Sequence, residues 1–110
     1  MWKEDKMAKF LLVYYGGQVE ADADPKMVEK TMALWMKWFA DLGKAVVDMG
    51  APTQPGKLVT KSGVKSTGAK PVAGYTILQA KNIDEAIAMA KSHPDVAEGM
   101  QVGVYPLAQM

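Results

Sequence analysis

The chain has 110 residues, and its 13 basic and 12 acidic side chains give a formal net charge of +1, which offers no charged surface for nucleic acid or an anionic membrane. Hydrophobic residues make up 49% and charged residues 23% of the chain, so we expect one globular domain over residues 1–110. Because cysteine is absent and histidine occurs once, disulfide bonds and thiolate chemistry are excluded, and we expect no metal site.

The first predicted element is a strand from Ala8 to Tyr15, which is rich in strand-forming residues and ends at a pair of glycines. Apolar side chains lie on both of its faces, so we expect both faces to be buried. The following loop, Gln18 to Asp24, contains three acidic residues without the spacing of a calcium-binding loop. We therefore expect a solvated loop there.

The longest predicted element is a single amphipathic helix from Pro25 to Met49. Asp24 supplies an N-cap acceptor, and proline fits the first helical position because its missing N–H would have no partner there. We expect Gly43 to bend this helix and Gly50 to end it. A helical period places one apolar stripe toward the core. The stripe comprises Val28, Met32, Trp35, Phe39, Leu42 and Val46.

Two further strands are predicted after the helix. Lys57 to Lys61 is short and contains lysines, which favours an edge strand, whereas Val72 to Ala80 has apolar side chains on both faces. Between them, Ser62 to Lys70 contains glycines and small polar residues. This pattern is compatible with a hairpin and with a mobile loop, and it does not decide between them.

A second helix and a last strand complete the pattern. Asn82 and Glu85 give a capping-box signal at the start of this helix, Pro94 ends it, and the final strand runs from Met100 to Tyr105. The order is therefore βαββαβ. Two split β-α-β units of this kind are typical of an α+β, ferredoxin-like fold, a four-stranded antiparallel sheet with two helices on one face.

The strands also predict an assembly. If both helices cover one face of the sheet, the other face exposes more apolar surface than monomers usually tolerate. Packing two sheets face to face in a twofold homodimer would bury both faces and form a barrel-like core. We therefore expect a homodimer, a dimeric α/β barrel.

A series of short segments stands in a fixed order along the chain: Phe10-Leu11-Leu12-Val13-Tyr14-Tyr15-Gly16-Gly17, Trp35-Met36-Lys37-Trp38-Phe39, Gly50-Ala51-Pro52, Gly74-Tyr75, Asp84-Glu85-Ala86, His93-Pro94 and Val104-Tyr105-Pro106-Leu107. In order and spacing, and over nearly the whole chain, these segments resemble the YCII-related (DGPF-type) family. The resemblance implies a dimeric α+β barrel. It implies little chemistry. A few relatives are similar to lactone isomerases or dehalogenating enzymes, and some are found alongside sigma factors.

The chain departs from that family at two places. Where many relatives carry Asp-Gly-Pro-Phe before the third strand, it has Gly68-Ala69-Lys70-Pro71. The first strand, first loop and long helix contain no histidine, so the His–Asp pair proposed as catalytic in the smaller YCII lineage is not matched. That activity is therefore not carried over to this chain.

His93 and Asp95 are the candidate catalytic residues. The imidazole has a usual pKa near neutrality, and Asp95, two residues later, could orient it for acid–base chemistry. A histidine before proline at a helix end is also typical of a C-terminal cap, which benefits from the helix dipole. We favour the cap, with the ring at the outer end of the second helix.

The candidate ligand-binding residues are aromatic. Such side chains could line a pocket for a small apolar or aromatic ligand, although packing in the core is their commoner role. No motif indicates a cofactor. The candidates are Tyr14, Tyr15, Trp35, Trp38 and Tyr75.

The sequence thus predicts a homodimer with a small-molecule pocket between the sheet and the long helix, and it does not decide whether the protein is an enzyme. We expect a cytoplasmic location, because no apolar run could span a membrane and no cleavage signal follows the charged opening. One alternative is a cofactor-independent enzyme with lactone isomerase-like or dehalogenase-like proton-transfer chemistry at His93. The other is a protein-interaction module with a regulatory role, acting through Ser62 to Lys70.

Overall fold

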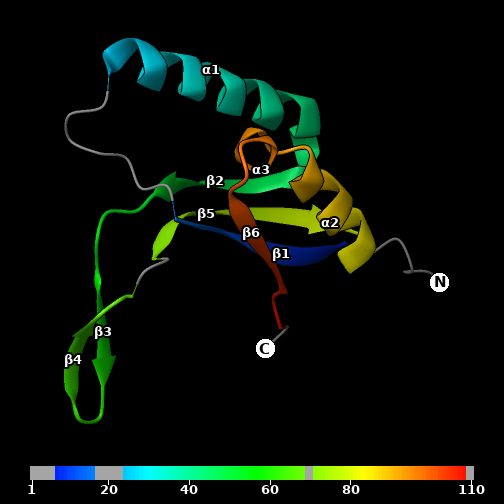
Figure 1. Ribbon diagram of the computed structural model, residues 1–110. Coiled ribbons are helices and arrows are strands. Elements are labelled where there is room, and N and C mark those ends of the chain that lie inside the picture. Colours follow the sequence, from blue (N-terminus) through cyan, green and yellow to red (C-terminus); the bar gives the residue numbers. More distant parts are fainter. Residues whose placement is uncertain (1–6, 17–23, 69–70, 109–110) are drawn as a thin grey trace.

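The computed structural model describes residues 7–16, 24–68 and 71–108. It has a mixed α+β architecture in which helices lie over a four-stranded antiparallel sheet, compatible with a ferredoxin-like fold (Figure 1). Within the described ranges, no helix has the length and apolar character needed to cross a bilayer. The elements in chain order are β1 (Ala8–Tyr15), α1 (Pro25–Leu42), a 3-10 turn (Gly43–Ala45), β2 (Val46–Pro52), β3 (Lys57–Thr60), β4 (Gly63–Ser66), β5 (Val72–Ala80), α2 (Ile83–Lys91), α3 (Pro94–Ala97) and β6 (Gln101–Pro106).

The sheet is built around its two central strands, in the order β2-β5-β1-β6. Leu12 of β1 lies opposite Thr76 of β5 on one side and Val104 of β6 on the other. Both central strands carry apolar side chains on both faces, but only the face toward the helices holds fully buried Leu12 and Leu78, whereas Leu11 and Ile77 on the other face are half-buried. The strands predicted from Ala8 to Tyr15 and from Val72 to Ala80 are confirmed with these bounds, and the last strand begins one residue later than predicted.

The predicted helix from Pro25 to Met49 is wrong over its last seven residues. The start is confirmed, since Asp24 caps α1 by accepting a hydrogen bond from the Lys26 N–H at 2.9 Å. The helix ends at Leu42, because Gly43 adopts a positive φ of 55° and returns its N–H to the Phe39 carbonyl. Gly43–Ala45 instead form a 3-10 turn, and Val46–Pro52 form β2, which pairs with β5.

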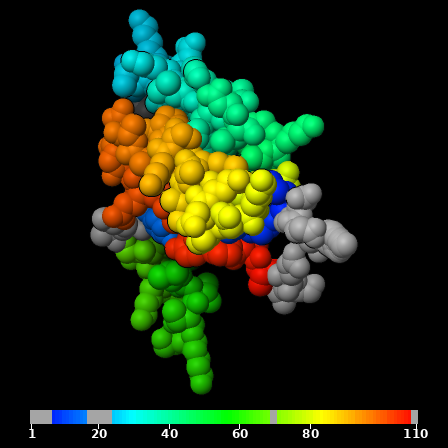
Figure 2. All heavy atoms as spheres, turned by 90° about the vertical axis from the view of Figure 1, so that its right-hand side faces the viewer, coloured from blue at the N-terminus to red at the C-terminus, as the bar shows by residue number. Residues whose placement is uncertain are grey.

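The second predicted strand also has a different place. Lys57–Thr60 does not join the main sheet but pairs with Gly63–Ser66 in a two-stranded hairpin, which projects away from the sheet on the side opposite α1 (Figures 1 and 2). The open alternative at Ser62 to Lys70 is therefore a hairpin over its described part, while residues 69 and 70 lie outside the described residues. The acidic loop predicted before α1 also lies outside them, except for Asp24.

The second helix, α2, confirms the predicted capping signal. Asn82 Oδ1 accepts a hydrogen bond from the Glu85 N–H at 2.9 Å, and the Glu85 carboxylate reaches back to the Lys81 N–H at 3.2 Å. The Glu85 N–H is one of the first-turn donors that the helix would otherwise leave without a partner, while the Lys81 N–H belongs to the residue just before the N-cap.

The core lies between the sheet and the helices. Its centre contains Leu12, Tyr14, Trp38, Leu78 and Ala90, and a smaller group of Phe10, Ala80 and Ala86 lies under α2. The opposite face of the sheet is also apolar: Leu11, Tyr15, Tyr75 and Ile77 are half-buried there, and Tyr105 is exposed. Among the described elements, no helix lies over that face (Figure 1).

Candidate functional site

A cavity of about 350 Å³ lies between α1 and the sheet. Its volume is at the lower end of the range typical of small-molecule sites. Three sides are formed by α1, by β2 and by the start of α3 with the ends of β1 and β5. The lining residues are Tyr14, Thr31, Met32, Trp35, Met36, Phe39, Met49, Gly50, Ala51, Pro52, Ala73, Asp95 and Met100.

The wall from α1 follows from helical spacing. Met32, Met36 and the aromatic pair Trp35 and Phe39 lie three and four residues apart, so they share one side of the helix. The ring centroids of Trp35 and Phe39 are 6.2 Å apart in an edge-on arrangement. This side of α1 is incompletely covered, since 53% of Met32 and 51% of Met36 remain exposed.

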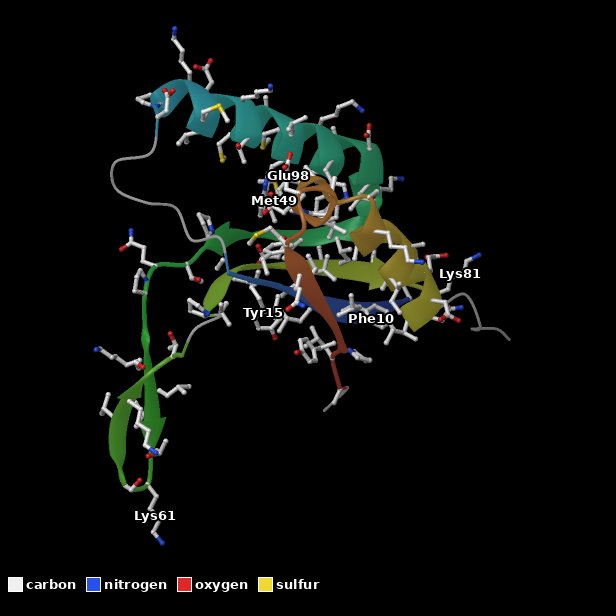
Figure 3. The ribbon with its side chains drawn as sticks, in the orientation of Figure 1. Phe10, Tyr15, Met49, Lys61, Lys81 and Glu98 are labelled. Atoms are coloured by element: carbon white, nitrogen blue, oxygen red, sulfur yellow. The ribbon has the colours of Figure 1, made fainter. Side chains whose placement is uncertain are left out.

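The opposite wall comes from β2, where Figure 3 shows Met49 on the side facing α1. Gly50 has a positive φ of 72°, and a Cβ atom there would lie only 1.8 Å from the Tyr75 carbonyl oxygen. Only glycine fits that backbone approach. The turn is held by Asp48, whose carboxylate accepts a hydrogen bond from the Gly50 N–H at 2.7 Å.

His93 lies behind this cavity and is not among its lining residues. Its side chain is 1% exposed, and its ring centroid is 4.4 to 4.6 Å from those of Tyr14, Trp35 and Trp38. His93 Nδ1 accepts a hydrogen bond from the Asp95 N–H at 3.0 Å, which caps the start of α3. The histidine is thus a cap, but at the start of α3, and its ring is buried rather than at the solvent end of α2 as predicted.

Burial lowers the pKa of His93 to about 4, so the imidazole is neutral at physiological pH. Because Nδ1 is an acceptor, the proton of the neutral ring is on Nε2. No hydrogen-bond partner for Nε2 occurs within the described residues. A buried donor without an acceptor costs free energy.

Asp95 is the sequence-predicted catalytic residue that does line the cavity. Its carboxylate accepts a hydrogen bond from Trp35 Nε1–H at 3.2 Å, while its contact with His93 is made by the backbone N–H. Burial raises the pKa of the Asp95 carboxyl, and the hydrogen bond from Trp35 acts in the opposite direction. The Asp95 carboxylate therefore lies at the cavity wall and makes no hydrogen bond to the His93 imidazole.

The five predicted ligand-binding aromatics are divided by the sheet. Tyr14 and Trp35 line the cavity, whereas Trp38 is buried behind it, where its indole N–H donates to Ser92 Oγ at 2.9 Å. Tyr15 and Tyr75 lie on the opposite face of the sheet, and the hydroxyl oxygens of Tyr15 and Tyr105 are 2.8 Å apart.

The hydroxyl group of Tyr14 faces the core. It donates to Thr76 Oγ1 at 2.6 Å, and Thr76 in turn donates to the Met49 carbonyl at 3.0 Å. Burial raises the pKa of Tyr14 to about 12. The tyrosine therefore offers the cavity the apolar surface of its ring and not an acid–base group.

The sequence interpretation missed most of the β2 wall, because Met49 was placed at the end of a helix. The four lining methionines, Met32, Met36, Met49 and Met100, were a usable signal, since methionine adapts to irregular cavities. In the part of the chain that the structure describes, no group of three or more histidine, aspartate or glutamate side chains could hold a metal ion.

Comparisons with known proteins add no family assignment: no family model matches the chain, and no curated protein is significantly similar to it.

Proposed function

We propose that this protein is a homodimer that binds a small, largely apolar molecule in the cavity between α1 and the sheet. The cavity itself carries the proposal: about 350 Å³ walled by methionine and aromatic side chains, with one carboxylate as its charged group. Apolar walls with few polar groups are typical of small-molecule sites. The YCII-like relationship, the βαββαβ ferredoxin-like topology and the cytoplasmic location predicted from the sequence are parts of this proposal.

The strand order supports the topology. If the hairpin β3–β4 is treated as an insertion, the four strands of the βαββαβ pattern are β1, β2, β5 and β6 in chain order. Numbered 1 to 4 in that order, they lie in the sheet as 2-3-1-4. The uncovered apolar face supports the homodimer, because a second sheet packed there would remove Leu11, Tyr75 and Ile77 from water.

The ligand site can be tested with a substitution that fills the cavity. Met36→Trp adds a large ring to the wall, whereas Met27→Trp makes the same change at an exposed position of α1 outside the cavity. The neutral fluorophore N-phenyl-1-naphthylamine, which brightens in apolar surroundings, should bind the wild type and Met27→Trp. We expect Met36→Trp to weaken this binding at least tenfold, about 1.4 kcal/mol. Equal binding to both variants would contradict the proposal.

A second candidate function is a cofactor-independent proton-transfer enzyme. The observation that favours it is the raised pKa of Asp95 in an apolar cavity, since such shifts are common among catalytic acids and bases. His93 is less suited to that role than the sequence predicted, because its imidazole is neutral and lies behind the lining residues. If catalysis occurs, Asp95→Asn should abolish turnover while the fluorophore still binds.

The protein-interaction alternative depends on the hairpin. Val59 and Val64 lie opposite each other in β3 and β4, and 81% of Val59 is exposed. An isolated two-stranded hairpin is marginally stable in water, so a partner that covers this valine pair would stabilise it.

A further inference from the structure

The lining of the cavity has an uneven charge pattern. Of the thirteen residues that line it, Asp95 has the one carboxyl group, and none is lysine, arginine or histidine. In the part of the chain that is described, a ligand in this cavity therefore meets a negative charge without a basic side chain to neutralise it.

The carboxylate has unused hydrogen-bonding capacity. Trp35 Nε1–H donates to Oδ1 at 3.2 Å, and among the described residues no other donor reaches this carboxyl group. An ionised carboxylate can accept about four hydrogen bonds. Oδ2 is thus available to a donor on the ligand, next to the aromatic side chains of Trp35 and Tyr14, whose ring centroids are 5.0 Å apart.

We propose that the cavity selects a small aromatic amine in its cationic form, with the ammonium group on Asp95 Oδ2 and the ring among the methionine and aromatic walls. This inference rests on the proposed function and names the class of its ligand. An ammonium group donates to carboxylates and is attracted to aromatic faces, so one group of the ligand satisfies both features of the site. A carboxylate-bearing ligand would be repelled by Asp95.

The desolvation of Asp95 also favours a cationic ligand. Burial raises the pKa of its carboxyl group because the charged form lacks solvent. A bound cation would supply the missing counter-charge. A neutral alcohol of the same shape would supply only a hydrogen bond, which is weaker than a charge-assisted one.

The test compares three probes that share one ring: 2-phenylethylamine as the cation, 2-phenylethanol as the neutral analogue and phenylacetate as the anion. Binding is followed at pH 7 by the NMR shift of the Trp35 indole proton, which reports directly on the hydrogen bond to Asp95. We expect the amine to bind at least about tenfold more tightly than the alcohol, and the anion to bind more weakly than both.

Two variants test whether the preference for the amine depends on Asp95. Asp95→Asn should reduce the ratio of amine to alcohol affinity to about one while the alcohol affinity is retained. Glu98→Gln removes a carboxylate from the end of α3 outside the cavity and should leave the ratio unchanged. Because the ratio is measured first in the wild type, it remains a test even if Asp95→Asn fails to fold.

Several outcomes would overturn the inference. Equal affinities for the amine and the alcohol in the wild type would leave the cavity as an apolar ligand site without charge selectivity. A preference for the amine that survives in Asp95→Asn would place the cation elsewhere. If none of the probes binds and the naphthylamine fluorophore also fails, the proposed function falls together with the inference.

Discussion

His93 is the residue at which burial and ionisation conflict most strongly. Its ring lies among three aromatic side chains, and burial lowers its pKa to about 4 from a usual value of 6.5. Above about pH 6.5 the imidazole is neutral in the folded and the unfolded chain, so it adds no pH dependence there. Between about pH 6.5 and 4 the unfolded chain binds a proton that the folded chain does not.

The free energy of unfolding should therefore fall as the pH is lowered from 6.5 to 4, by an amount on the order of 3 kcal/mol. Urea denaturation at half-unit pH steps measures this slope. His93→Asn keeps an acceptor at the N-cap of α3 but removes the titrating group, so its slope should be flatter. Because burial raises the pKa of Asp95 in the folded chain, Asp95 opposes this fall in the free energy of unfolding. It does so in both the wild type and His93→Asn. Identical slopes would mean that the histidine is not buried in its neutral form.

The role of His93 illustrates what sequence can and cannot predict at single residues. Its place before proline predicted a C-terminal cap of α2, whereas Ser92 caps α2 and His93 caps the start of α3. Its burial depends on Tyr14 and Trp35, which are distant in sequence and come from β1 and α1. Tyr14 and Tyr15 were both recognised as pocket candidates, but the sequence could not show which of them faces the cavity. The packing of α1 decides which side of the sheet holds the cavity.

At the scale of elements, the sequence predicted the two central strands, both helix starts and the last strand. It failed from Gly43 to Pro52, where the apolar period of α1 continues into Val46 and the residues after it. Local pattern favours a longer helix there, whereas Val46 pairs with Leu78 of β5, a contact across more than thirty residues. Such long-range pairing overrides local periodicity and created the β2 wall of the cavity.

The hairpin β3–β4 should be nearly independent of the core. Replacing both Val59 and Val64 by threonine keeps strand-forming residues at exposed positions, so we expect the free energy of unfolding to change by less than about 0.5 kcal/mol. Leu78→Ala, in the buried centre of β5, should cost about 2 to 5 kcal/mol in the same urea titration. A comparable loss from the two valines would indicate that another surface covers the hairpin in solution, as the interaction alternative requires.

At the scale of the whole molecule, the two faces of the sheet have different surroundings. One face is covered by α1 and α2 and contains the buried core, while the other exposes part of Leu11, Tyr75, Ile77 and Tyr105. Light scattering should therefore give a mass of about twice the 11.9 kDa of one chain. The uncovered face, rather than α1, is the surface we expect to meet the second copy.

Ile77→Lys tests which face is used, because it places a charge in the middle of the uncovered face while leaving the helix-covered core unchanged. A buried, unpaired ammonium is costly, so this variant should shift the mass toward that of a single chain. Ala88→Lys adds the same charge at an exposed position of α2 and should remain a dimer. If Ala88→Lys dissociates the protein and Ile77→Lys does not, the copies meet through the helical layer. A wild-type monomer at micromolar concentration would contradict the homodimer, because the apolar face would then be stable in water without a second copy.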